Sequence, residues 1–201
     1  MNAKKYDRAY FDRWYRDPQH RVKARGETRR KVQMAVGLAE YYLGRTITNV
    51  LDIGCGEGIW RSPLRALRPG IDYLGLDSSD YAISRFGRSR NLRPARFADL
   101  AELRFDRRFD LIICSDVAHY LGAAELRRGL SGFPELLEGL AFIELFTSKD
   151  PVDGDTTGFI SRSPKWYREC FASAGLMACG SHCYLAPDLM RSVSALERAE
   201  A

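Results

Sequence analysis

The sequence predicts an α/β protein, with a Rossmann-like, doubly wound and mostly parallel sheet and an N-terminal helical cap. Short apolar runs alternate with amphipathic segments along most of the chain, as in repeated strand–helix units. Four of the apolar runs end at a polar residue, namely Asp52, Asp77, Asp99 and Ser115-Asp116. Because ligands bind beyond the carboxyl ends of parallel strands, these positions predict one shared site.

Capping and breaking residues divide the chain into elements. Asp17-Pro18 ends a first helix, Thr28 and Gly44 bound a second, and Ser62-Pro63 and Ser163-Pro164 open two later ones. The expected helices cover about 6–17, 28–43, 62–68, 80–86, 126–137 and 164–174, and the expected strands 47–53, 71–76, 95–97, 109–114, 140–146 and 176–185. We therefore divide the chain into a cap, residues 1–27, and a ligand-binding domain, residues 28–201.

Length and composition indicate a soluble globular protein. The chain has 201 residues, of which 45% are apolar and 28% charged, enough for one domain with a full core. No apolar run has membrane-spanning length and the first residues are charged, so neither a membrane span nor a secretory signal is expected. The five cysteines lack a disulfide-framework spacing, which favours the cytoplasm.

The net charge of +5 is concentrated in the first part of the chain. Residues 1–31 carry +7 and the remaining residues sum to −2. Such a basic arm can bind nucleic acid, attract an anionic small substrate, or form a solvated helix face, which is the commonest case. Because the chain has no RNA-binding motif, nucleic acid is not the partner that we expect.

The turn after the first strand predicts the chemistry of the ligand. Residues 50–58 have the sequence VLDIGCGEG, in which the glycines allow close backbone approach and the next helix offers free N–H groups. The carboxylate of Asp52 disfavours phosphate there and favours a cationic ligand such as S-adenosylmethionine, with its ammonium and sulfonium. The rival nicotinamide fingerprint, G-x-G-x-x-G, needs a glycine at position 59, where the chain has Ile59.

With these strand ends in view, the chain resembles the class I S-adenosylmethionine-dependent methyltransferases of the small-molecule type over roughly residues 30–185. VLDIGCGEG (50–58), YLGLD (73–77), FADL (97–100) and FDLIICSDVAHYL (109–121) are similar to successive motifs of that family, and WYRECFASAGL (166–176) to a helix of its small-molecule members. The resemblance implies that Gly54, Cys55 and Gly56 cradle the methionine part beside Asp52. It also implies that Asp77 accepts from the ribose hydroxyls, next to Ser78.

The same resemblance implies which residues contact the adenine and which lie at the mouth of the site. Asp99 would accept from the adenine amine, and the Leu100 backbone N–H would donate to the ring. Ser115 and Asp116 would lie beside the cofactor. His119, just beyond the fourth strand, is the candidate general base if the acceptor carries a proton of high pKa, although it could instead pack against the cofactor or cap the next helix.

Acceptor contacts are expected from three places outside the motifs. Tyr6, Tyr10 and Trp14 lie at helical spacing and either form a lid over the site or pack on the sheet edge. Tyr120 could orient the acceptor. The polar loop 147–163, including Lys149, either borders the acceptor or is an ordinary solvated loop, and its length favours function.

No metal is expected. Cys179, His182 and Cys183 resemble a metal cluster, but on one strand residue 182 would face away from the other two and no fourth ligand is evident. The sequence thus predicts methyl transfer from S-adenosylmethionine to a small-molecule acceptor. The alternatives are an RNA or protein methyltransferase that uses the basic arm, and a cofactor-binding regulatory protein without catalysis.

Overall fold

We analysed a computed structural model, which describes residues 4–20, 26–152, 154–194 and 196. The strands are β1 (Asn49–Ile53), β2 (Asp72–Asp77), β3 (Leu92–Pro94), β4 (Phe109–Ser115), β5 (Leu137–Glu144), β6 (Met177–Gly180) and β7 (Cys183–Leu185). The α-helices are α1 (Arg8–Phe11), α2 (Glu27–Leu43), α3 (Arg61–Leu67), α4 (Asp80–Arg90), α5 (Ala123–Leu130), α6 (Phe133–Leu136) and α7 (Pro164–Ser173). The π- and 3-10-helical segments are η1 (Asp12–Arg16), η2 (Phe97–Ala101), η3 (Ala118–Tyr120) and η4 (Pro187–Ser192).

The strands form one seven-stranded sheet in the order β3-β2-β1-β4-β5-β7-β6. The pairs among β1 to β5 are all parallel, whereas β7 runs antiparallel to both β5 and β6. The order reverses between β1 and β4, which makes the carboxyl edge there the expected place for a ligand. The predicted α/β fold class is confirmed.

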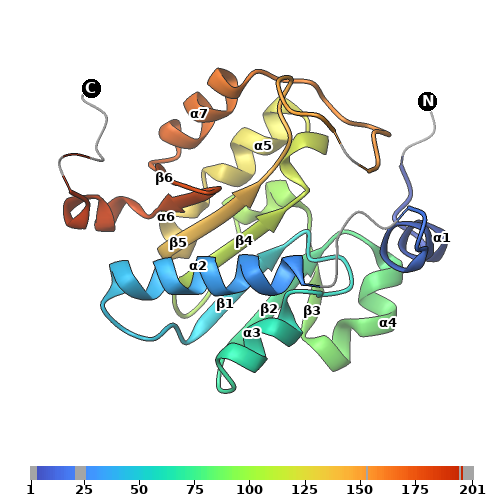
Figure 1. The fold of residues 1–201 in the computed structure, drawn as a ribbon, viewed down its shortest axis with the longest axis horizontal. Coiled ribbons are helices and arrows are strands. Elements are labelled where there is room, and N and C mark those ends of the chain that lie inside the picture. The colour runs from blue at the N-terminus through green and yellow to red at the C-terminus, as the bar shows by residue number, and fades with distance from the viewer. Residues whose placement is uncertain (1–3, 21–25, 153, 195, 197–201) are drawn as a thin grey trace.

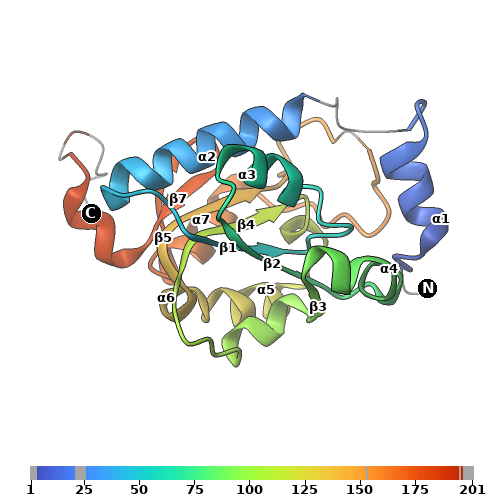
Figure 2. The same cartoon turned by 90° about the horizontal axis from the view of Figure 1, so that it is seen from below.

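Helices cover both faces of the sheet (Figures 1 and 2). The apolar stripe of α2 packs with α3 on one face, where Val32, Val36 and Leu64 are fully buried. On the other face α5, α6 and α7 contribute Leu126, Phe133 and others to a second cluster. Every residue of β1 is buried, as expected for a central strand covered on both sides. The strand that leads into the glycine turn is therefore held rigidly.

The N-terminal segment lies apart from these two layers. Helix α1 and the following η1 stand at the edge near α4 in both views, and Asp17 ends the helical path as predicted. Helix α2 begins at Glu27 after Gly26, so Thr28 lies inside it rather than capping it. In the described part of the chain, no helix is both long and apolar enough to cross a membrane.

The end of the sheet differs from the expectation of one strand over 176–185. Residues 177–185 form a hairpin, β6 and β7, whose turn residues Ser181 and His182 have φ values of 50° and 63°. Cys179 and Cys183 therefore lie on different strands. No group of three or more potential ligands (His, Cys, Asp or Glu) gathers around a metal position within the described residues.

Candidate active site

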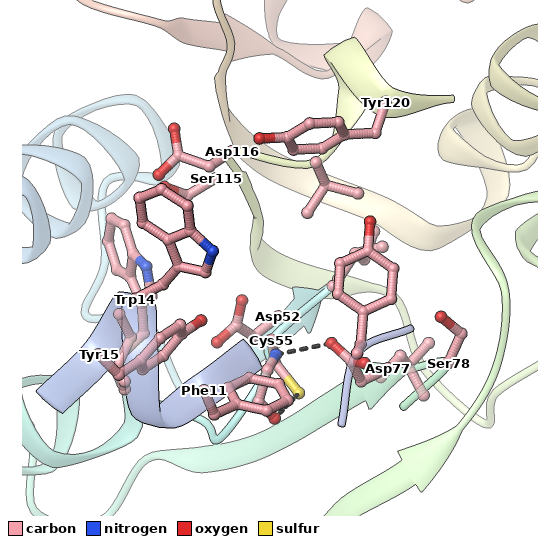
Figure 3. A pocket seen from close by; sticks show the side chains of 18 of the residues that line it. Phe11, Trp14, Tyr15, Asp52, Cys55, Asp77, Ser78, Ser115, Asp116 and Tyr120 are labelled. Atoms are coloured by element: carbon pink, nitrogen blue, oxygen red, sulfur yellow. Dashed lines mark hydrogen bonds between the residues drawn. The ribbon is translucent and has the colours of Figure 1, made fainter. Parts of the chain in front are cut away.

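A cavity of about 1240 Å³ opens at the carboxyl edge of the sheet. Its wall joins the turn after β1, the ends of β2 and β4, the N-terminal segment and parts of the loop after β5. The predicted site residues that line it are Tyr6, Tyr10, Trp14, Asp52, Gly54, Cys55, Gly56, Asp77, Ser78, Ser115, Asp116, His119 and Tyr120. The topology thus brings residues from distant stretches of sequence into one space (Figure 3).

The glycine turn after β1 is shaped by two hydrogen bonds from its backbone N–H groups. Gly54 N–H donates to the carbonyl of Leu76 at 2.7 Å, and Gly56 N–H donates to Asp77 Oδ2 at 2.7 Å. Gly54 has a φ of +64°, and a Cβ there would lie 2.3 Å from Val117 Cγ2. Only glycine fits this backbone path, since a side chain would be strained and would collide with the segment after β4.

Two buried carboxylates flank the turn. Asp52 Oδ2 accepts a hydrogen bond of 2.6 Å from the Tyr73 hydroxyl. Asp77 also accepts from Ser79 N–H, through Oδ1 at 2.8 Å, so both of its oxygens bind backbone N–H groups. Burial raises the pKa of Asp77 above its usual value, while these hydrogen bonds act in the opposite direction. Each carboxylate oxygen has two lone pairs, so Asp77 can still accept from two hydroxyl groups of a ligand.

The end of β4 presents Asp116 to the cavity in an uncommon backbone conformation. Its φ is +62°, in the left-handed region that aspartate tolerates better than most residues. Its N–H donates to the carbonyl of Glu144 on β5, and Ser115 Oγ donates to the Glu144 carboxylate at 2.7 Å. Ser115 and Asp116 line the same cavity as Asp77 (Figure 3).

His119 is nearly fully buried on the cavity wall. Its ring lies among Tyr120, Phe146 and Phe159, at centroid distances of 4.2, 5.6 and 5.6 Å. Burial lowers its pKa to about 4, so the ring is neutral at pH 7. Nδ1 accepts from the Phe146 N–H at 3.3 Å, which assigns the proton to Nε2. This tautomer offers a donor at Nε2 and has no spare lone pair for taking a proton.

The N-terminal segment covers the glycine turn. Phe11 is buried and stacks on Tyr81 of α4 at 5.5 Å, and a Cβ on Gly56 would lie 2.6 Å from the Tyr15 hydroxyl. Figure 3 shows Phe11, Trp14 and Tyr15 reaching over the turn from α1 and η1. Two polar contacts beside the glycine turn and Asp77 help to hold the segment down. Arg16 pairs with Glu57 at 2.6 Å, and the carbonyl of Tyr6 accepts from Ser79 Oγ at 2.5 Å.

Three predicted site residues do not line the cavity. Asp99 is exposed, and its carboxylate accepts from the Arg96 N–H at 2.7 Å, because it caps η2. The Leu100 side chain is fully buried in the core. Lys149 is exposed. Near Asp99 and Leu100, the cavity wall is instead formed by Ala95, Arg96 and Phe97. Near Lys149, it is formed by Phe146 and Asp155.

The sequence did not single out Lys4 or Asp155 as site residues. They lie 151 positions apart, yet Lys4 Nζ lies 2.6 Å from Asp155 Oδ2 inside the cavity. The available signal was weak, namely opposite charges in two segments that were both expected to border the acceptor. Neither segment has a periodicity that would reveal which charge points inward.

Comparisons with known proteins agree with this geometry. A family model described as "Methyltransferase domain" matches residues 51–139. No curated protein sequence matches the chain. The fold is similar to DesVI of Streptomyces venezuelae, with a TM-score of 0.63 at 15% identity, covering 81% of this chain and 93% of that chain.

Two further solved structures are similar. One is a SAM-dependent methyltransferase from Archaeoglobus fulgidus, with a TM-score of 0.59 at 16% identity over 84% of this chain and 73% of that chain. The other is the plantazolicin methyltransferase BamL in complex with a triazolic desmethylPZN analog and SAH. It has a TM-score of 0.58 at 16% identity over 75% of this chain and 63% of that chain.

The sheet order, the reversal beside β1 and the cavity beyond it define a Rossmann-like enzyme fold. The matched family model spans β1 to the start of β5, which includes the glycine turn and Asp77. Residues 51–139 therefore match a methyltransferase domain, and the fold around them is shared with S-adenosylmethionine-dependent methyltransferases. The predicted resemblance and enzyme class agree with both findings, and the matched family supports S-adenosylmethionine as the cofactor.

Proposed function

We propose that this enzyme transfers the methyl group of S-adenosylmethionine to a small-molecule acceptor inside the covered cavity. The observation that carries the proposal is the cavity, which the glycine turn, the N-terminal aromatic residues and the loop after β5 line together. At about 1240 Å³ it exceeds the roughly 300–1,000 Å³ of a typical small-ligand pocket. This size supports binding of the cofactor and a second molecule side by side.

The residues at the glycine turn fit the cofactor. When bound, S-adenosylmethionine supplies a methyl group on a cationic sulfonium that is already activated for displacement. We assign Asp77 to the ribose hydroxyls, because its oxygens keep lone pairs free for two donors. Gly54, Gly56 and Asp52 would hold the methionine part, and Ala95 to Phe97 would contact the adenine in place of Asp99 and Leu100.

Alignment and exclusion of water are the main tasks that the protein has in such a displacement. Trp14 and Tyr120 also line the cavity, and we assign them to the acceptor. His119 supports a donor role rather than the predicted base role, because its Nδ1 lone pair is already used. Replacement by Asn would keep a donor, whereas Ala would remove it, so His119→Asn should retain more activity than His119→Ala.

Residues 1–27 are proposed to act as a lid. Lid contacts come from both ends of the described segment, through Tyr6 to Ser79 and Arg16 to Glu57. Deletion of residues 1–20 should leave a folded core, because the two main apolar clusters contain no residue of that stretch. It should abolish turnover, which a coupled assay for S-adenosylhomocysteine release would measure.

An RNA or protein acceptor is the main alternative, and it depends on the basic arm. The structure favours it less, because Lys4 pairs with Asp155 inside the cavity and Arg16 pairs with Glu57 and Asp12. A salt titration of RNA binding separates the two classes, since phosphate contacts give a steep loss of affinity with salt. The five cysteines are all free, which supports the proposed cytoplasmic location.

The central experiment measures cofactor binding and turnover separately. Calorimetry with S-adenosylmethionine should give a saturable isotherm for the wild type, and a screen of small acceptors should then identify which compounds cause release of S-adenosylhomocysteine. Absence of binding heat together with an unchanged melting temperature would refute the proposed function. Binding without turnover of any acceptor class would favour the non-catalytic regulatory alternative.

A further inference from the structure

The ammonium group of Lys4 occupies an enclosed cage within the cavity. Lys4 Nζ lies 3.7 Å from the ring centroid of Tyr120, and 5.2 and 5.3 Å from those of Tyr6 and Tyr10. It donates to the carbonyl of Thr157 at 3.1 Å and pairs with Asp155 at 2.6 Å. All of these contacts suit a positive charge, since ring faces, carbonyl and carboxylate oxygens are electron-rich.

This cage is more than a surface ion pair. The side chains of Lys4 and Asp155 are only 15% and 9% exposed, whereas surface pairs of this kind are mostly solvated. The far wall of the cage belongs to the body of the protein rather than to the N-terminal segment. Tyr120 follows β4 through η3, and its hydroxyl donates to the Asp155 carbonyl at 2.6 Å. Tyr120 and Asp155 therefore hold each other in place without Lys4.

The occupant of the cage, by contrast, comes from the covering segment. Lys4 is joined to α1, which is held over the site by a few polar contacts and by Phe11. Movement of this segment would withdraw Lys4 and leave Tyr120, Asp155 and the Thr157 carbonyl lining a vacated cation pocket. That pocket is continuous with the space beside Asp116 and Asp77, because Tyr120 and Asp155 line the same cavity as these two acids.

We propose that this cage is the acceptor subsite and that it binds an alkylammonium group of the acceptor. Lys4 fills the cage until the acceptor binds. The inference rests on the proposed function and specifies its substrate class as a compound with an aliphatic amine. It replaces the anionic acceptor that the basic arm suggested, because Lys4, which lines the cavity, is already paired with Asp155. Lys4 is then an internal competitor, which lowers the apparent affinity for the amine by occupying its subsite.

The binding test uses n-butylammonium, which has the same four-carbon chain as lysine, and n-butanol as its neutral counterpart. Both are titrated by NMR into protein saturated with S-adenosylhomocysteine, for the wild type, Lys4→Ala, and Lys4→Ala with Asp155→Asn. Lys5→Ala is the matched control, because Lys5 is adjacent but exposed. Lys4→Ala should bind n-butylammonium about tenfold more tightly than the wild type or Lys5→Ala does, and the added Asp155→Asn should reverse the gain. Equal affinity of Lys4→Ala for both probes would overturn the proposal.

The catalytic test compares amine acceptors with their hydroxyl counterparts in the S-adenosylhomocysteine assay. An amine acceptor should show a KM that falls in Lys4→Ala and rises about tenfold in Tyr120→Leu, with Lys5→Ala unchanged. Turnover of an uncharged acceptor with a KM insensitive to Asp155→Asn would overturn the cage as acceptor subsite. That result would leave methyl transfer itself established, whereas failure to bind S-adenosylmethionine would refute the proposed function instead.

Discussion

Alanine at position 56 tests whether the N-terminal segment closes the cavity. The φ of Gly56 is +53°, so an alanine there costs roughly 1–2 kcal/mol in backbone strain. Its Cβ would also lie 2.6 Å from the Tyr15 hydroxyl oxygen and 3.1 Å from Phe11 Cε1. The segment can relieve this overlap by moving away. The destabilisation of Gly56→Ala beyond backbone strain is then at most the free energy of burying Phe11, about 1.5–3 kcal/mol.

Gly44→Ala is the matched control for the backbone term. Gly44 ends α2 with a φ of +66°, and nothing lies within 4 Å of an added Cβ. It should lose about 2–8 °C in melting temperature through strain alone, and Gly56→Ala should lose more. Only Gly56→Ala should be cut faster by trypsin after Arg13 and Arg16. Its affinity for S-adenosylmethionine should also fall about tenfold, which corresponds to about 1.4 kcal/mol.

The difference between the two glycine variants is the decisive quantity. If Gly56→Ala and Gly44→Ala are digested at the same rate without cofactor, the N-terminal segment does not rest on Gly56 in solution. The closure argument would then be wrong, even if cofactor affinity fell, because an added Cβ could also touch the cofactor directly.

Three further predictions concern polar side chains of the site. The free energy of unfolding should rise between about pH 4 and pH 6.5, because the unfolded chain binds a proton there that neutral, buried His119 does not. In His119→Asn this rise should shrink by at most about 3 kcal/mol. Urea unfolding at a series of pH values measures it, and an unchanged pH dependence would contradict the burial of a neutral His119. Tyr73→Phe removes the hydroxyl that donates to the buried Asp52 carboxylate, so thermal unfolding should show a loss of about 1.5–3 kcal/mol. A loss below roughly 0.5 kcal/mol would contradict this expectation. Asp77→Asn should weaken S-adenosylmethionine binding about 10- to 100-fold in calorimetry, and full affinity would remove Asp77 from the ribose contact.

The sequence predicted the central strands well, because their residues are buried on both faces. β1, β2 and β4 appear where continuous apolar runs end in polar residues. The start of β1 was placed two residues early. The N–H groups of Thr48 and Asn49 both donate to the carboxylate of Asp110 on β4, and a partner 61 or 62 positions away leaves no local pattern.

Elements at the sheet edges were predicted less well. β3 covers 92–94 rather than 95–97, and Leu92 is its only buried residue, so it has no alternating pattern to detect. The hairpin of β6 and β7 was expected to be one strand. Its turn places Ser181 and His182 in left-handed conformations, where asparagine and glycine are the usual signal.

The site was predictable where backbone geometry dictates residue type. The glycines of the first turn and the acids at strand ends line the cavity as expected. Asp99 does not line it, because its carboxylate caps η2 instead, a choice that depends on the local turn. The partnership of Lys4 with Asp155 depends on how two irregular segments meet, and no periodic signal encodes such a meeting.

The contacts that hold the N-terminal segment also have a consequence for the timing of turnover under the proposed lid role. Arg16 pairs with Glu57 in the glycine turn, and the Tyr6 carbonyl accepts from Ser79, two residues after Asp77. With the proposed lid closed, departure of the spent cofactor would require these contacts to break. Such opening steps often limit turnover. The Arg16 side chain is 44% exposed, so dissolved ions can screen its attraction to Glu57. We therefore expect the turnover rate to increase at moderate ionic strength if product release, rather than methyl transfer, is the rate-limiting step.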